Sequence, residues 1–177
     1  MQSATLSPGR RKLLLTTHIA ATVSVLGADL VLLLLGLAGL GGTDQRTIYP
    51  AAHLVGTWLV TPLAFLSLGT GLLLGLLTTY GLLKYWWVAI KLVITTALTG
   101  AVLLVLVPRL ASAAEAVTGP SPRFLAGGEQ LALVLAPAAA STLLLLNVAF
   151  AVYKPGWRLQ SRSVSTAAPY RAQPEPE

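Results

Sequence analysis

Four long runs of apolar residues dominate the sequence, at 13–40, 51–79, 85–107 and 130–153. At about 1.5 Å per residue, each run is long enough to cross a hydrocarbon core about 30 Å thick as a helix. Leucine and alanine fill the runs without regular alternation of polar residues, and a helix satisfies its own backbone groups within the bilayer. The pattern therefore predicts an all-α transmembrane four-helix bundle over 13–153.

The composition agrees with a membrane protein. Of the 177 residues, 55% are hydrophobic and 10% are charged, whereas a soluble domain carries about 25% charged residues. The absence of cysteine excludes disulfides, thiolate metal sites and thiol nucleophiles. No phosphate-binding glycine loop, zinc-protease helix, nucleophile elbow or dinucleotide fingerprint is present, so no catalytic residue and no metal site is predicted.

The first apolar run follows Arg10, Arg11 and Lys12, as the apolar region of a signal peptide would. Such a region is about 7 to 15 residues long and ends at a cleavage site with small residues. The run at 13–40 is longer and fits neither feature. We expect an uncleaved first span that follows a cytoplasmic segment at 1–12.

The basic residues lie at the ends of the apolar runs and form no single patch, so the net charge of +6 does not indicate a nucleic-acid partner. Lysine and arginine are retained on the cytoplasmic side of a membrane. With four spans, one side carries Arg10, Arg11, Lys12, Lys84, Lys154, Arg158, Arg162 and Arg171, and the other carries Arg46, Arg109 and Arg123. This predicts antiparallel, up-and-down helices with cytoplasmic N and C termini. The cytoplasmic tail at 154–177 is expected to be mobile, because it holds few apolar residues.

Features near the span ends complete the predicted topology. The longest loop is expected outside the cell, at 109–129, and it holds the turn-rich stretch 119–122. Aromatic residues are expected to anchor the cytoplasmic boundary: Tyr80, Tyr85, Trp86, Trp87, Tyr153 and Trp157. The small residues Gly71 and Gly75 permit close helix approach, either within the chain or, as an alternative, in a homodimer.

Three polar residues inside the predicted spans lie at one depth. His18 is five residues past Leu13, Lys91 six past Tyr85, and Asn147 six before Tyr153. Ionisable residues within spans usually face the bundle interior and mark function. We interpret the layer of His18, Lys91 and Asn147 as a candidate binding site for a hydrophobic cofactor or ligand. The alternative is that Lys91 reaches the headgroups and His18 bonds a neighbouring helix.

Asp29 lies near the middle of the first run, eleven residues after His18. At 100° per residue, this spacing leaves about 20° between the two side chains, so they share a helix face. Asp29 is a candidate for a proton relay or, equally, a packed and protonated carboxyl group. His53 begins the second span on the opposite side, so a haem bound by both histidines is not expected. His18 could still bind haem b as a single ligand or pair with a second copy.

A resemblance rests on three segments: 11–27 with His18, the tryptophan-rich 84–93 that leads to Lys91, and 152–156. Together they resemble an actinobacterial family of uncharacterised four-span membrane proteins, over most of 11–158. That family is distantly similar to the membrane domain of copper-resistance protein D and to the HemJ-type protoporphyrinogen oxidases. The similarity implies functional positions at His18 and Lys91. This chain lacks the additional histidines of a fuller copper or haem site.

Three functional hypotheses follow. The first is a small integral membrane protein without enzymatic activity that binds a hydrophobic or quinone-like ligand near His18, Lys91 and Asn147. The second is a haem-dependent oxidoreductase resembling the HemJ type, with His18 as the haem ligand. The third is proton or copper-ion transport through Asp29, although four helices leave little room for alternating access.

Overall fold

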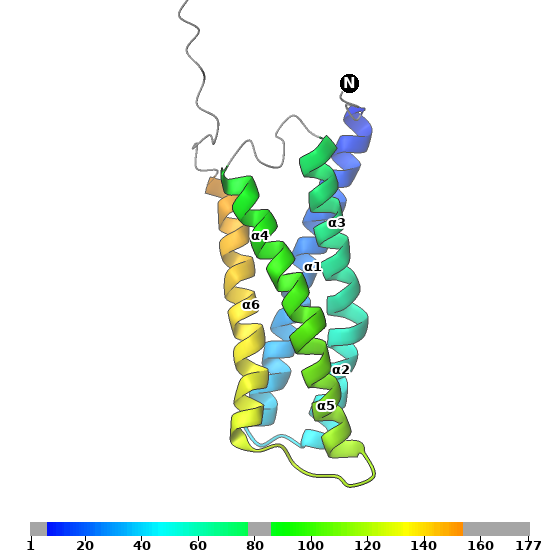
Figure 1. Ribbon diagram of the computed structural model, residues 1–177, viewed down its shortest axis with the longest axis vertical. Helices are drawn as coiled ribbons and strands as arrows, with labels where there is room; N and C mark the ends of the chain where they lie inside the picture. Colours follow the sequence, from blue (N-terminus) through cyan, green and yellow to red (C-terminus); the bar gives the residue numbers. More distant parts are fainter. Residues whose placement is uncertain (1–6, 78–85, 154–177) are drawn as a thin grey trace, which may run out of the picture.

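The computed structural model describes residues 7–77 and 86–153, with side chains placed for 7–77 and 89–149. In these ranges, four helical stretches are long and apolar enough to cross a membrane: Pro8–Leu40, Gln45–Leu77, Ala89–Thr118 and Gly127–Ala149. They run along one common long axis (Figure 1). The prediction of an all-helical protein with four such helices is confirmed, and the fold is that of a multi-pass membrane protein.

The first and last stretches are single helices, α1 (Pro8–Leu40) and α6 (Gly127–Tyr153). The second consists of α2 (Gln45–Val55), the π-helical turn η1 (Gly56–Val60) and α3 (Thr61–Leu77). The third consists of α4 (Trp86–Ala101), the π-helical turn η2 (Val102–Leu106) and α5 (Val107–Thr118). We call the end at which α1 begins and α6 stops the terminal end, and the opposite end the loop end (Figure 1).

Each π-helical turn is followed closely by a proline. Pro62 and Pro108 have no backbone N–H, and in a regular α-helix their rings would clash with the carbonyl four residues earlier. The backbone widens instead: the N–H of Thr61 donates to the carbonyl of Gly56, and that of Val107 to the carbonyl of Val102. This i to i−5 pairing lets both stretches continue as helices past the prolines.

The third stretch extends beyond its predicted end at 107 and reaches Thr118. The prediction of a loop from 109 onward was therefore wrong over 109–118. Alanine-rich sequence favours a helix here, and Leu110, Ala113, Ala114 and Val117 recur at helical spacing and are buried. Hydropathy marks where apolar sequence stops, whereas a helix can continue for as long as one face is covered.

Two short connections lie at the loop end. Gly42 adopts a positive φ of 92° in the turn between α1 and α2, a conformation that glycine enters without strain. Asp44 then caps α2, because its carboxylate accepts from the N–H of Arg46 at 3.3 Å and from the hydroxyl of Thr47 at 3.0 Å. This turn holds α1 beside α2.

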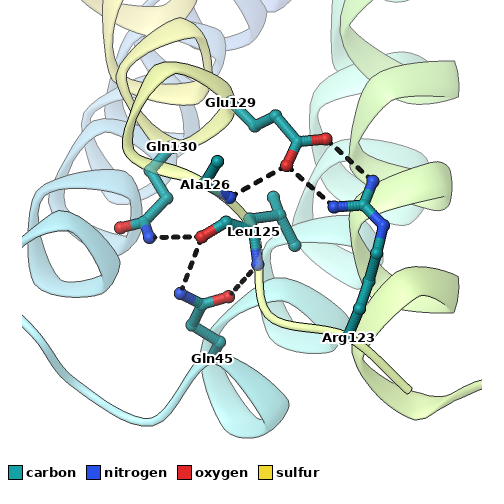
Figure 2. Close-up of polar contacts among 6 residues, drawn as sticks. All are labelled: Gln45, Arg123, Leu125, Ala126, Glu129 and Gln130. Atoms are coloured by element: carbon teal, nitrogen blue, oxygen red, sulfur yellow. Dashed lines mark hydrogen bonds and ion pairs between the residues drawn. The ribbon is translucent and has the colours of Figure 1, made fainter.

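The second connection, 119–126, is fixed by side chains (Figure 2). The amide of Gln45 pairs with both backbone groups of Leu125, accepting from its N–H at 2.7 Å and donating to its carbonyl at 3.4 Å. Gln130 also donates to that carbonyl, at 2.8 Å. Arg123 donates two hydrogen bonds to Glu129, at 2.8 and 2.9 Å, and Glu129 accepts a third from the N–H of Ala126. The cluster joins the start of α6 to the start of α2.

The apolar core is concentrated toward the loop end. It includes Leu32 of α1, Tyr49 of α2, Leu110 of α5 and Leu133 of α6, all of which are buried. The third stretch is the least buried of the four, with 17% of its most apolar window buried against 28% to 33% in the others. The terminal half of α4 is therefore the more loosely packed part of the bundle.

Some sequence-based predictions lie outside the described residues. These are the cytoplasmic tail at 154–177, the basic residues Lys84, Lys154, Arg158, Arg162 and Arg171, and the aromatic anchors Tyr80, Tyr85 and Trp157. For Trp86, Trp87 and Tyr153 the backbone is described and the side chains are not.

Candidate functional site

His18 lies at the crossing of α1 and α3, in the terminal half of the bundle. Its Nδ1 is 3.1 Å from the carbonyl oxygen of Ser67 and 3.0 Å from the hydroxyl oxygen of Thr70. One turn further along α1, the hydroxyl of Thr22 lies 3.0 Å from that of Ser67 and donates to the carbonyl of His18 at 2.8 Å. Polar groups therefore join α1 and α3 over two helical turns.

These contacts define which nitrogen of His18 carries the proton. A carbonyl oxygen can only accept, so Nδ1 must donate to Ser67. The hydroxyl hydrogen of Thr70 is directed at the carbonyl of Leu66, at 2.6 Å, and Thr70 is therefore also an acceptor toward His18. Nδ1 carries a hydrogen in this arrangement, and in the neutral ring Nε2 keeps its lone pair. A histidine fixed through Nδ1–H to a carbonyl presents Nε2 as a base, acceptor or metal ligand.

Gly71 makes room for the imidazole. A Cβ atom built at this position would lie 3.0 Å from Cε1 of His18, closer than ordinary van der Waals contact. Gly69, on the same helix, has nothing within 4 Å of its corresponding position. The small residue that matters for the His18 contact is thus Gly71.

Asn147 of α6 contacts the third stretch. It is 5% exposed, and its amide nitrogen donates to the hydroxyl of Thr95 at 3.1 Å. Its amide oxygen is buried and has no partner in the part of the chain that the structure describes. A buried carbonyl-type oxygen without a donor is costly, and native structures contain few of them.

Lys91 lies one helical turn before Thr95 on α4, a spacing that places the two side chains on neighbouring positions of one face. It is half-buried. Over the described ranges 7–77 and 89–149, no hydrogen bond or ion pair of Lys91 is found. Lys91 is thus a cation on the Thr95 face of α4 without a carboxylate partner among these residues.

The structure therefore relates the three predicted site residues unequally. Asn147 is connected to the Lys91 face of α4 through Thr95, whereas His18 is bonded to Ser67 and Thr70 of α3. No direct contact joins His18 to Asn147 among the described side chains. Thr95, which accepts from Asn147, is half-buried, whereas the next residue, Thr96, is exposed.

Asp29 contacts a different helix from His18. It is 2% exposed, and the hydroxyl of Ser141 on α6 donates to its Oδ2 at 2.6 Å. His18 and Asp29 belong to the same inward stripe of α1, which includes Val25 and Leu32, but His18 is bonded to α3 and Asp29 to α6. His53 is half-buried, with Nδ1 3.4 Å from the hydroxyl of Thr57.

Sequence reasoning missed the hydroxyl partners Thr22, Ser67, Thr70 and Ser141. A signal for them exists, because Ser67, Thr70 and Gly71 form a small and polar strip at helical spacing within an otherwise leucine-rich run. Such a strip predicts that another helix crosses here. It does not identify which residue of that helix packs against the strip.

We tested whether these residues suit a haem. His18 supplies one axial nitrogen, Nε2, with Nδ1 held by a carbonyl as is usual for iron-ligating histidines. The described residues hold no group of three or more His, Cys, Asp or Glu side chains. The small enclosed cavity near Tyr49, described below, lies toward the loop end and not beside His18. The donor set would hold a haem through one histidine nitrogen only.

Replacing Gly71 with alanine should displace the His18 ring, because the new Cβ would lie 3.0 Å from Cε1. We expect the ¹⁵N signals of the imidazole to shift in G71A and its Nδ1–H bond to weaken. The matched control is G69A, where the added methyl group meets nothing within 4 Å and the signals should stay in place. NMR of ¹⁵N-histidine-labelled protein in lipid gives the result, with His53 as the internal reference. Equal shifts in both variants would contradict the proposed contact.

Removing the hydroxyl of Ser141 should destabilise the bundle, because it leaves buried Asp29 without its bonded partner. The expected cost of S141A is about 1 kcal/mol, since hydrogen bonds between membrane helices are modest. The neighbouring T142A is the control, because Thr142 is exposed and bonds only within its own helix. Unfolding titrations in mixed micelles measure both. A double cycle with D29A that gives no coupling energy would refute a bond between the two side chains.

No protein-family model matches this chain, and comparison with curated proteins and with solved structures finds no match either. The resemblance to the four-span family consequently stays a prediction from sequence. Functional reasoning rests on the arrangement of the residues themselves.

Proposed function

We propose that this chain is a multi-pass protein of the bacterial plasma membrane that binds a hydrophobic ligand with a polar head in the terminal half of its bundle. The proposed topology has antiparallel neighbouring helices and a cytoplasmic terminal end. Support comes from the contacts of α1, because His18 near its start meets Thr70 while Gly39 near its end meets Tyr49. Support for the orientation comes from the exposed cluster of Arg10, Arg11 and Lys12 at the start of α1.

The ligand proposal rests on Lys91, whose ammonium group has no ion-pair partner within 7–77 and 89–149. An ammonium group within a membrane span is costly and is usually paired or directed toward a cavity or water. Lys91 is half-buried on the least buried stretch and has no ion pair within the described ranges. A ligand with an acceptor oxygen would supply the missing partner.

The neighbouring groups suggest the chemistry of the ligand head. Lys91 offers donors, whereas the amide oxygen of Asn147 and Nε2 of His18 offer acceptors. A carbonyl oxygen on the head would accept from Lys91, a hydroxyl group would donate to Asn147 or His18, and an apolar body would lie against the helices. A quinone supplies the carbonyl oxygens, and its reduced form supplies the hydroxyl groups. We propose binding and assign no turnover to the site.

Haem binding by His18 is the second candidate, and the free Nε2 is the observation that favours it. In that case His18 would hold the iron through Nε2, and Lys91 would offer a positive charge to an anionic propionate. A haem would supply redox chemistry, as the resemblance to the HemJ type implies. Protein purified from haem-supplemented cells would then show a Soret band that disappears in H18A.

Transport through Asp29 is not proposed. Its bonded partner is Ser141, and this pair is separated along α1 from the His18 contact by about three turns. The homodimer alternative remains a prediction.

Equilibrium dialysis of the protein in lipid nanodiscs tests the leading proposal, with a benzoquinone carrying a short alkyl chain as the probe. We expect K91M to weaken binding about tenfold or more, because a hydrogen bond to a charged group is lost. The control is K12M, which removes an exposed lysine at the start of α1 and should leave binding unchanged. Binding of equal strength in the wild type and K91M would overturn the role of Lys91, and a Soret band without quinone binding would favour haem.

A further inference from the structure

A small cavity lies toward the loop end, where α1, α2, α5 and α6 meet. Gly36, Tyr49, Leu133 and Pro137 contribute to its lining, and the remaining lining residues are apolar. Its accessible volume is about 10 Å³, close to the smallest volume that can hold one water molecule. The cavity is separate from the candidate ligand site in the terminal half.

One polar group that points to a ligand is the phenol of Tyr49. The residue is 1% exposed, and its hydroxyl has no hydrogen-bond partner in the part of the chain that the structure describes. Buried tyrosine hydroxyls normally find a partner. Tyr49 is also among the largest fully buried side chains, so its hydroxyl cannot turn outward to solvent without unpacking the core.

The second group is the backbone carbonyl of Leu133. In a regular helix it would accept from the residue four positions later, but that residue is Pro137, which has no N–H. The carbonyl oxygen is directed toward α1, because a Cβ built on Gly36 would lie 3.0 Å from it. A buried acceptor is therefore available on the wall of the cavity.

The two groups lie against neighbouring positions of α1. The hydroxyl of Tyr49 lies against Gly39, at 2.9 Å from a Cβ built there, just as the Leu133 oxygen lies against Gly36. Gly36 and Gly39 are three residues apart, so they are neighbours on one face of the helix. Tyr49 and Leu133 both line the cavity, so one water inside it has both residues as neighbours.

We propose that this cavity is a binding site for one structural water, which accepts from the hydroxyl of Tyr49 and donates to the carbonyl of Leu133. The water joins α2 to the proline-interrupted turn of α6 across the two glycines of α1. The site explains why three unusual features coincide: a glycine pair on α1, a proline inside α6 and a tyrosine hydroxyl in an apolar core. The volume limits the ligand to water, because anything larger would displace side chains.

A crystal structure of the full chain in a lipid mesophase, at a resolution that reveals ordered water, tests the proposal. The expected result is a density peak about 3 Å from both the Tyr49 hydroxyl and the Leu133 carbonyl oxygen. No peak between these atoms, or a Tyr49 hydroxyl bonded directly to a protein acceptor, would overturn it. The wild-type map alone gives this answer, so the test does not depend on a variant that folds.

The variant Y49F then tests which group holds the water. It removes only the hydroxyl, and we expect the peak to be lost while the helices stay in place. The control T118V removes a hydroxyl that bonds within its own helix at the loop end, and the peak should persist there. A peak of full height in Y49F would show that Tyr49 does not hold the molecule and would overturn the assignment.

Discussion

The fold depends on one constraint, which is that polar groups within hydrocarbon must be satisfied by the chain itself. Helices satisfy the backbone groups through their own hydrogen bonds. Each proline inside a helix removes one of these bonds, because it has no backbone N–H. Pro62 and Pro108 are each accommodated by a π-helical turn in which the hydrogen bonds shift to the residue five positions earlier. Pro137 is accommodated within α6, and it leaves the carbonyl of Leu133 to face the α1 crossing. Pro62 and Pro108 thus each accompany a π-helical turn, and Pro137 accompanies a buried acceptor.

The same constraint organises the side chains. Three polar residues on inner faces meet a hydroxyl or a carbonyl on a neighbouring helix: His18 meets Ser67 and Thr70, Asp29 meets Ser141, and Asn147 meets Thr95. These contacts join α1 to α3, α1 to α6 and α4 to α6, and each is also a point of helix packing. Within 7–77 and 89–149, the ammonium group of Lys91, the amide oxygen of Asn147 and the hydroxyl of Tyr49 have no such partner. These exceptions indicate where further molecules can bind, because polar groups in a span are costly when they are unpaired.

The sequence predicted the part of the structure that depends on length, because the four apolar runs correspond to four helices long enough to cross a membrane. The common depth of His18, Lys91 and Asn147, counted from the ends of these runs, stays a prediction. Counting could not give the rotation of each helix, and so it could not identify Ser67 or Thr70, which lie about 50 residues from His18 along the chain. The shared face of His18 and Asp29 was a sound inference about α1 alone. That inference did not show that α1 packs between two helices. The same face of α1 contacts α3 near His18 and α6 near Asp29. The segment 109–118 was wrongly predicted as a loop, because its charged and polar residues indicate exposure to water. The helix continues there because one of its faces, with Leu110, Ala113, Ala114 and Val117, is buried.

The distribution of these features divides the bundle into two halves with different physical properties. The loop half holds most of the apolar core and the side-chain clamp of Gln45, Arg123 and Glu129 on the 119–126 connection. The terminal half holds the contacts of His18 and Asn147 and the start of the least buried stretch, Ala89–Thr118. The apolar contacts that stabilise the bundle are therefore concentrated at the end opposite to the candidate binding site. The two π-helical turns lie between the halves and contact each other. The stable core and the candidate binding site are thus separated along the long axis of the bundle, and the π-helical turns that accommodate Pro62 and Pro108 lie between them.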